Sequence, residues 1–139
     1  MASIFTHIIA GKLPGHFVWK DEQAVAFMTI QPIRPGHLLV VPRLEIDQWD
    51  DLPEELTMHL MAVSRHIGRA LKATYGSARS ALIIAGFEVP HTHLHVLPAD
   101  EMGDLSFLKI YSAEQDELVR ESAAIRATLR QQGRPEAQF

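Results

Sequence analysis

Three histidines alternate with other residues in the segment His91-Thr92-His93-Leu94-His95. On a β-strand alternate side chains share a face, so we expect the three imidazoles in a row, with neighbouring Cα atoms roughly 6.5–7 Å apart. The unperturbed pKa of imidazole lies near neutrality, so such a row offers a nucleophile, a partner that fixes its tautomer and a proton donor. An imidazole nitrogen is also a competent nucleophile towards phosphorus. The spacing therefore favours covalent catalysis at a phosphate.

The same segment has two other interpretations. Neutral imidazole is a common zinc ligand, so the alternating histidines could supply two ligands to a metal ion and a carboxylate a third. Packing is the weaker explanation, because three adjacent imidazoles in the interior each need polar partners. The isolated histidines are expected to be hydrogen-bonded bystanders: His7, His16, His59 and His66.

Hydrophobic periodicity predicts the elements that position the three histidines. Strands are expected at residues 17–19, 24–30, 37–41, 80–85 and 91–97. Helices are expected at 4–9, from about 53 to 76, and at about 112–133, where a capping box opens the last one. A rigid, proline-containing loop is expected at 31–36 and a loose tail at 134–139. Five strands, with the longest helix between the third and the fourth, predict an α+β fold.

Composition limits the class of protein. The chain has 139 residues, 47% of them hydrophobic, which suits one domain over residues 1–139. Thirteen basic and seventeen acidic residues give a net charge of −4 without a basic run, so we expect no nucleic-acid partner. No cysteine is present, which excludes disulfides, a thiol nucleophile and thiolate zinc sites. The longest apolar run has seven residues and no signal-peptide pattern is visible, so we expect no membrane partner and a cytoplasmic location.

The histidine segment, continued to Leu97, resembles the signature of the histidine-triad (HIT) family, in which histidines alternate with hydrophobic residues. The stretch from Ile4 to Pro14 (IFTHIIAGKLP) resembles the opening segment of that family, and Pro35 to Pro42 (PGHLLVVP) resembles its central strand. The three motifs occur in the correct order, and the resemblance covers roughly residues 3–100. The variant Val89-Pro90-His91 is most similar to a bacterial, actinobacterial-type branch.

The resemblance implies a HIT-like fold: a five-stranded, mainly antiparallel sheet with one long helix and a C-terminal helix. It also implies a homodimer whose sheet continues across two subunits. His93 is similar to the nucleophile that takes the nucleotidyl group from the α-phosphate. His91 and His37 resemble the histidines that orient it, and His95 resembles the one that contacts phosphate oxygen near the leaving group. The positions that match the apolar base pocket are Ile4, Phe5, Ile8, Leu13, Phe27 and Ile30.

Three features depart from the family pattern at the expected substrate site. Thr29 replaces the usual aspartate that binds the ribose hydroxyls, and a threonine cannot make the same pair of charge-assisted bonds. The phosphate-binding loop is shortened, with Phe87 near the glutamine position and Glu88 near the hydroxyl position. A carboxylate there would repel a phosphate unless it is turned away, protonated or paired with a cationic leaving group. The cysteines that bind zinc in some members are missing, so we expect no metal and no cofactor.

The function expected from these features is that of a nucleotide hydrolase or transferase acting through a nucleotidyl-histidine intermediate. The expected substrates are nucleoside phosphoramidates, dinucleoside polyphosphates or similar nucleotidyl compounds, attacked at the α-phosphate. Two alternatives belong to other classes: a nucleotide-binding or sensing module with little turnover, and a histidine-rich metal-binding protein. The lost phosphate donors favour the binding module, and the intact row of histidines argues against it.

Overall fold

A five-stranded antiparallel sheet forms the centre of the protein in a computed structural model that describes residues 1–139. The strands are β1 (Phe17–Lys20), β2 (Ala24–Met28), β3 (Leu38–Pro42), β4 (Arg79–Ile83) and β5 (Leu94–Ala99). They lie in the order β1-β2-β3-β5-β4, and every neighbouring pair is antiparallel. The α+β class and the antiparallel sheet predicted from the sequence are therefore confirmed.

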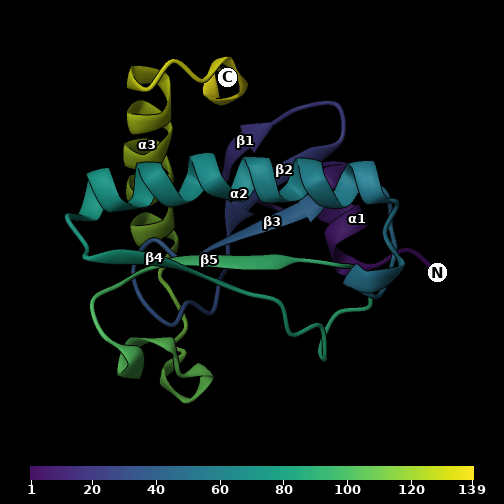
Figure 1. Cartoon of the computed structure of the whole chain (residues 1–139), viewed down its shortest axis with the longest axis horizontal. Helices are drawn as coiled ribbons and strands as arrows, with labels where there is room; N and C mark the ends of the chain where they lie inside the picture. Colours follow the sequence, from purple (N-terminus) through teal and green to yellow (C-terminus); the bar gives the residue numbers. More distant parts are fainter.

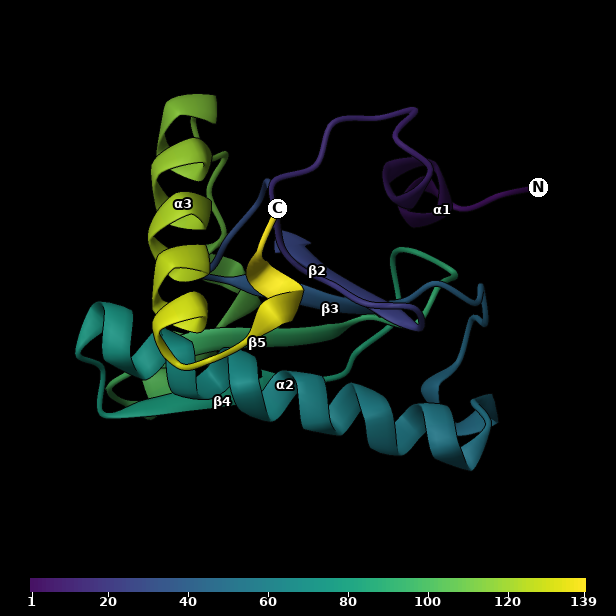
Figure 2. The ribbon, with the colours of Figure 1, turned by 90° about the horizontal axis from the view of Figure 1, so that it is seen from above.

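Helices cover the two faces of this sheet unequally. The three α-helices are α1 (Ile4–Ile9), α2 (Glu54–Tyr75) and α3 (Gln115–Gln131). Four 3-10 turns complete the structure: Trp49–Asp51, Met102–Leu105, Phe107–Lys109 and Pro135–Ala137. Figure 2 shows α2 on one side of the sheet and the short α1 on the other. The axis of α3 crosses that of α2 at a steep angle at one end of the sheet (Figure 1). No helix has both the length and the hydropathy that crossing a membrane requires.

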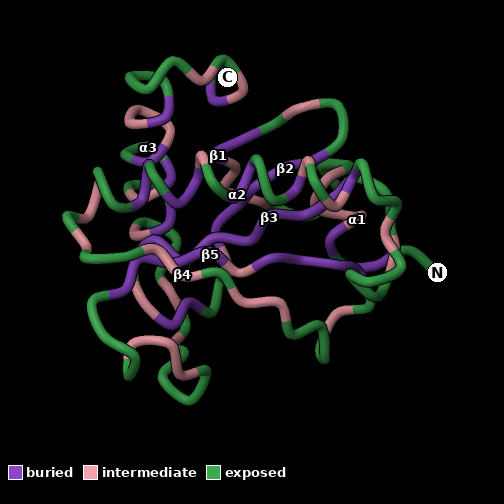
Figure 3. Tube along the Cα trace, viewed as in Figure 1, coloured by how far each residue is buried: buried purple, intermediate pink, exposed green.

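The strands β2 and β3 are buried on both faces, which is why their sequences are continuously apolar. In β3, for example, Leu38 and Val40 belong to the main core beneath α2 and α3, whereas Leu39 and Val41 belong to a smaller core beneath α1. The buried stretches of the trace follow these central strands, and the exposed stretches lie mostly in the loops and at the ends (Figure 3). The sheet thus separates two apolar compartments.

The longest helix follows its sequence pattern closely. The predicted stripe Leu56, Leu60, Val63, Ile67 and Leu71 is buried in the main core. Two glutamates in its first turn face the positive end of the helix dipole. The helix ends at a glycine, which has φ 64° and whose N–H closes the last turn.

Several predicted boundaries were wrong. The strand expected at 91–97 begins at Leu94, because the N–H groups of His91 and Thr92 bond to Val89 and Ile46 instead of to a neighbouring strand. The predicted strands 24–30 and 80–85 end at Met28 and Ile83.

The C-terminal region also differs from the prediction. The capping box expected at Ser112 does not form, and α3 begins at Gln115 without a side-chain cap. The tail expected to be loose carries a 3-10 turn whose Ala137 is fully buried in the main core. Contacts of Arg134 with His66 and of Phe139 with Lys20 also hold this tail.

Candidate active site

The strands β3 and β5 and the segments that precede them bring four histidines together on the α1 side of the sheet. His95 lies on β5 directly opposite Leu39 of β3, and His37 immediately precedes β3. Because Leu94 and Val96 pack into the main core, the alternating residue His95 faces the other compartment. His91 and His93 lie in the turn before β5 and reach the same compartment, since both rings contact Phe5 of α1.

His93 has one ring nitrogen fixed and the other free. Its Nδ1 lies 2.7 Å from the carbonyl oxygen of His91. A carbonyl only accepts, so Nδ1 carries the proton and the lone pair resides on Nε2, which bonds to no protein group. The ring is 6% exposed and stands edge-on to Phe5 at 5.0 Å between centroids. Burial lowers the pKa of His93, which keeps the imidazole neutral and able to attack an electrophile.

A relay of hydrogen bonds sets the tautomer of His95. The backbone N–H of Ile33 donates to Nδ1 of His37 at 2.9 Å, so Nε2 of His37 carries the proton of the neutral ring. That Nε2–H donates to Nδ1 of His95 at 2.9 Å. The remaining proton of His95 is therefore on Nε2, which makes no bond within the protein. His95 stands 5.0 Å from His93 between ring centroids, so a bare nitrogen and an N–H donor lie side by side.

Burial holds both rings of the relay in the neutral form. It lowers the pKa of His37 to about 3, with a further decrease from the neighbouring His95. It lowers the pKa of His95 to about 4, helped by His93. The free site is thus an uncharged row of imidazoles.

His91 connects this row to the N-terminal helix. Its Nε2–H donates to the carbonyl of Pro42 at 2.8 Å, and its Nδ1 lies 2.7 Å from the hydroxyl of Ser3. The same hydroxyl caps α1 by accepting the N–H of Thr6, and Glu45 accepts the N–H of Ser3. His91 is completely buried, and it reaches His93 only through its carbonyl oxygen. Its side chain therefore holds α1 against the sheet.

An apolar cavity of about 310 Å³ opens between α1, β2 and the segment that follows α1. It gathers every residue expected to form a base pocket: Ile4, Phe5, Ile8, Leu13, Phe27 and Ile30. Leu39, Pro14 and Thr29 also line it. Residues from three separate parts of the chain thus meet in one hollow large enough for a flat ring.

A second cavity, of about 330 Å³, contains the histidines. His37, His93 and His95 line it, and Thr29 belongs to both cavities, at the boundary between them. Phe87 and Glu88 of the shortened loop line its outer side, where Phe87 is 95% exposed.

The sequence did not predict that the segment after β5 forms a wall of this second cavity. Phe107 stands edge-on to His95 at 5.0 Å between centroids, and Ile110 lines the cavity beside it. The sequence left the role of residues 100–111 open, and Phe107 and Ile110 of this segment lie at the cavity. The only sequence signal was the apolar character of a segment that follows the last strand.

A third hollow beside His93 is lined by acidic side chains. A groove of about 470 Å³ reaches His93 beside Trp49 and is lined by Asp47 and Asp50. Neither this groove nor the cavity with the histidines is lined by a lysine or an arginine.

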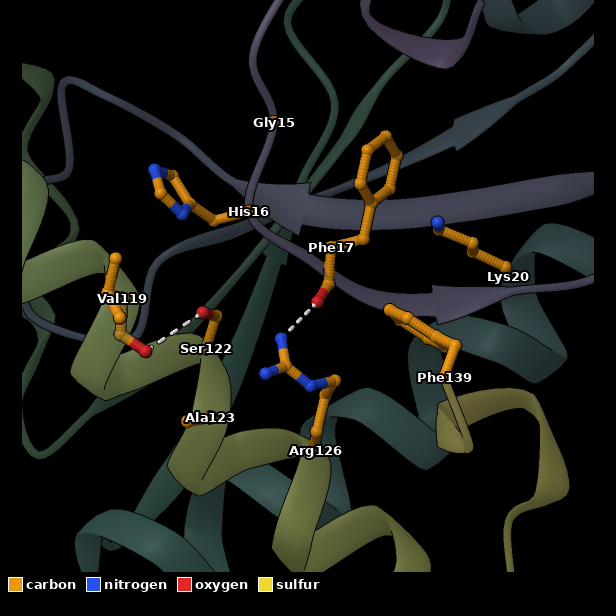
Figure 4. A pocket seen from close by; sticks show the side chains of 9 residues that line it. All are labelled: Gly15, His16, Phe17, Lys20, Val119, Ser122, Ala123, Arg126 and Phe139. Carbon is orange, nitrogen blue, oxygen red and sulfur yellow. Dashed lines mark hydrogen bonds between the residues drawn. The ribbon is translucent and has the colours of Figure 1, made fainter. Parts of the chain in front are cut away.

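Two basic side chains lie in a shallow pocket between β1 and α3, which shares Gly15 and His16 with the apolar cavity (Figure 4). There Arg126 donates to the carbonyl of Phe17 at 2.9 Å, and the ammonium of Lys20 lies over the rings of Phe17 and Phe139. These two cations are engaged by the protein itself.

The four isolated histidines do not all fit the expectation that they are hydrogen-bonded bystanders. His59 bonds to Asp21 and His66 lies 3.3 Å from Arg134, away from the site. His16 bonds to Gln115, but both residues line the apolar cavity, and His7 makes no side-chain hydrogen bond. No three histidine or carboxylate side chains are placed so that they could hold a metal ion, and the chain has no cysteine.

Comparisons with known proteins agree on one family. The sequence model of the HIT domain matches residues 10–102. An uncharacterized HIT-like protein of Methanocaldococcus jannaschii is 31% identical over 125 residues, which cover 85% of this chain and 96% of that protein. The adenosine 5'-monophosphoramidase HNT1 of Saccharomyces cerevisiae is 32% identical over 98 residues, 70% of this chain and 62% of that one.

A solved structure shows the same fold over nearly the whole chain. The zinc-bound histidine triad family protein of Mycobacterium smegmatis superposes with a TM-score of 0.82 at 27% identity and covers 96% of each chain. The C-terminal helix and the segment before it are therefore shared with at least one relative.

Proposed function

Because this chain belongs to the histidine triad (HIT) family, we propose that it is a nucleotide hydrolase or transferase whose His93 forms a transient nucleotidyl-histidine. The observation that carries the proposal is the free Nε2 lone pair of His93, left bare because Nδ1 donates to a carbonyl. A buried, neutral imidazole with a fixed tautomer is a ready nucleophile towards phosphorus.

The lining of the two cavities supports one orientation of the nucleotide in this proposal. The apolar cavity under α1 receives the base, and Thr29, which lines both cavities, stands where the sugar passes. The α-phosphate then reaches His93 and His95, and the leaving group occupies the cavity beside Glu88 and Phe107.

The proposed reaction has two steps. First, Nε2 of His93 bonds to the α-phosphorus and the bond from phosphorus to the leaving nitrogen or oxygen breaks. His95, which has taken up one more proton in the complex with the anionic substrate, gives its Nε2 proton to the leaving group and returns to the neutral form. Then water attacks the phosphorus, its proton returns to His95, and the nucleoside monophosphate leaves His93. An anionic phosphate beside the two rings raises their low pKa values, which suits both for proton transfer in the complex.

The charge of the site favours an amine leaving group, as in a nucleoside phosphoramidate. Carboxylates line both spaces that open at His93: Glu88 on one side, Asp47 and Asp50 on the other. No lysine or arginine is present there to hold the leaving phosphate chain of a dinucleoside polyphosphate. Complementarity therefore selects a basic leaving group over an anionic one. Hydrolysis of phosphoramidates is also what the yeast relative is named for.

Two further features of the proposal concern the protein as a whole. We expect a homodimer in which the edge strand β4 pairs with its copy and continues the sheet, and sedimentation equilibrium tests this. A cytoplasmic location remains a prediction.

Trapping the intermediate tests the function directly. Purified protein mixed briefly with an α-³²P-labelled adenosine or guanosine phosphoramidate and quenched in alkali should retain acid-labile label on the peptide that contains His93. His93→Ala should lose the label and several orders of magnitude of turnover, because the nucleophile is deleted. His95→Ala and His37→Ala should be milder, by ~10²–10⁴-fold, because they remove proton transfer or the relay that sets it. His91→Ala should also be milder, because it removes the side chain that holds α1 and leaves the carbonyl that binds His93.

The matched control is His7→Ala, since His7 makes no side-chain hydrogen bond and lies outside both cavities. Tight nucleotide binding without label or turnover would favour the binding module. Normal turnover in His93→Ala would refute the assignment of the nucleophile.

A further inference from the structure

The C-terminal helix α3 is hydrogen-bonded to the loop that carries His37. The N–H of Gly36 donates to Oε1 of Glu121 on α3 at 2.6 Å, and the hydroxyl of Tyr75 on α2 donates to the same oxygen at 3.1 Å. Gly36 has φ 88°, and a Cβ on it would lie 2.6 Å from the ring of Tyr75, so only glycine fits here. The carboxyl group of Glu121 thus joins three elements at one atom.

This contact lies one residue from the relay that sets the tautomer of His95. His37 is 1% exposed, and it receives the N–H of Ile33 from its own loop. The same loop is held again by the N–H of Tyr111, which donates to Pro32 at 3.1 Å. The orientation of His37 therefore depends on contacts from residues 111–121, which lie beyond the region that matches the HIT domain.

We propose that Glu121 is a positioning residue that, by holding Gly36, keeps His37 donating to His95 and so keeps the free proton of His95 on Nε2. This inference rests on the proposed function, in which that proton goes to the leaving group. Glu121 touches neither cavity of the substrate site, so it acts only through the loop.

The surroundings of Glu121 make its contact with the loop of His37 sensitive to pH. Its carboxyl group lies within hydrogen-bonding reach of that of Glu117, whose Oε2 accepts the hydroxyl of Tyr111 at 2.7 Å. The ionisable groups that face it are Glu117, Tyr75 and Tyr111, and neither glutamate forms an ion pair. Burial and the neighbouring Glu117 raise the pKa of Glu121, whereas the hydrogen bonds from Gly36 and Tyr75 act in the opposite direction because they favour the carboxylate.

The sign of the pH effect follows from the raised pKa of Glu121. A raised pKa means that the contribution is complete at low pH and is lost as pH rises through that pKa. Above it, burial beside Glu117 disfavours the charged carboxylate in this position, although Gly36 and Tyr75 still donate to it. A glutamine at position 121 keeps the acceptor oxygen for Gly36 and does not ionise. It should therefore hold the loop at every pH.

The test compares Glu121→Leu, Glu121→Gln and the control Asp116→Asn, which removes one charge from an exposed position of the same helix. With a nucleoside phosphoramidate, Glu121→Leu should lower kcat by ~10–100-fold with little change in KM, because a misplaced proton donor weakens only the transition state. Glu121→Gln should keep the kcat of the wild type at low pH. It should also lack the decrease in kcat that the wild type shows as Glu121 loses its proton.

Long-range ¹H–¹⁵N spectra of the imidazoles provide a readout that needs no turnover. The wild type should show His37 and His95 each protonated only at Nε2, and Glu121→Leu should show mixed tautomers in a folded protein. A folded Glu121→Leu with the tautomers of the wild type overturns the proposal, even if the protein has no activity. If Glu121→Leu does not fold, identical pH dependence of the His37 and His95 signals in the wild type and Glu121→Gln overturns it.

Discussion

The buried relay should make the protein markedly less stable in mild acid. His37 is 1% exposed, and its pKa is lowered to about 3, whereas in the unfolded chain it returns to about 6.5. Between these values the unfolded chain binds a proton that the folded protein does not, so the free energy of unfolding decreases as pH falls below about 6.5. From about pH 7 to about pH 5, His37 alone should cost about 2 kcal/mol. His95, with its pKa lowered to about 4 and its ring partly open to the cavity, adds a smaller amount.

Urea unfolding followed by the fluorescence of the buried Trp19 would measure this effect at the two pH values. His37→Asn removes the titrating ring but keeps an oxygen near the position of Nδ1 for the N–H of Ile33. The variant should lose about 2 kcal/mol less than the wild type between about pH 7 and about pH 5. His7→Asn makes the same substitution where the side chain has no hydrogen bond and should behave like the wild type. Equal pH dependence in His37→Asn and the wild type would refute the argument that burial keeps His37 neutral.

Three further outcomes are expected. Thr29 lacks a carboxylate for the ribose hydroxyls, so the wild type should discriminate weakly between ribose and 2′-deoxyribose substrates. A charged hydrogen bond contributes about 1.5–3 kcal/mol, so Thr29→Asp should raise the ratio of kcat/KM for the ribose substrate to that for the 2′-deoxyribose substrate by ~10-fold or more. An unchanged ratio would place the sugar elsewhere. Glu88→Gln should lower the ratio of kcat/KM for a lysyl-type phosphoramidate to that for a dinucleoside polyphosphate, whereas a constant ratio would leave Glu88 a surface residue. Dialysis against a chelator should leave turnover unchanged with substoichiometric zinc by emission spectrometry; stoichiometric zinc and chelator-sensitive activity would instead support a metalloprotein.

The apolar cavity shows how much of a site a local sequence pattern can predict. Ile4, Phe5 and Ile8 have helical spacing, and Phe27 lies in a strand that is apolar on both faces, so each was identifiable as a buried or lining residue. Their meeting in one cavity depends on α1 lying across the sheet from α2 (Figure 2). What places α1 there is a set of long-range contacts, of which the bond between Ser3 and His91 spans 88 positions. No local pattern encodes such a contact.

The sequence by itself determined the fold class, the number of strands, their approximate positions along the chain and the concentration of histidines in one segment. Strand periodicity is a local property of the chain. The sequence did not determine which hydrogen bond each imidazole makes. His93 bonds to a carbonyl two residues away, His95 to a ring 58 positions away, and His91 to Pro42 and Ser3.

Those partners decide which nitrogen carries the proton, and hence which ring can attack and which can donate. They are brought together only when the strands pair into the sheet and α3 packs against the loop of His37. The tertiary structure alone therefore assigns the four histidines their different positions in the hydrogen-bond network. Residue type and spacing provide the imidazoles, and long-range packing sets their protonation and direction.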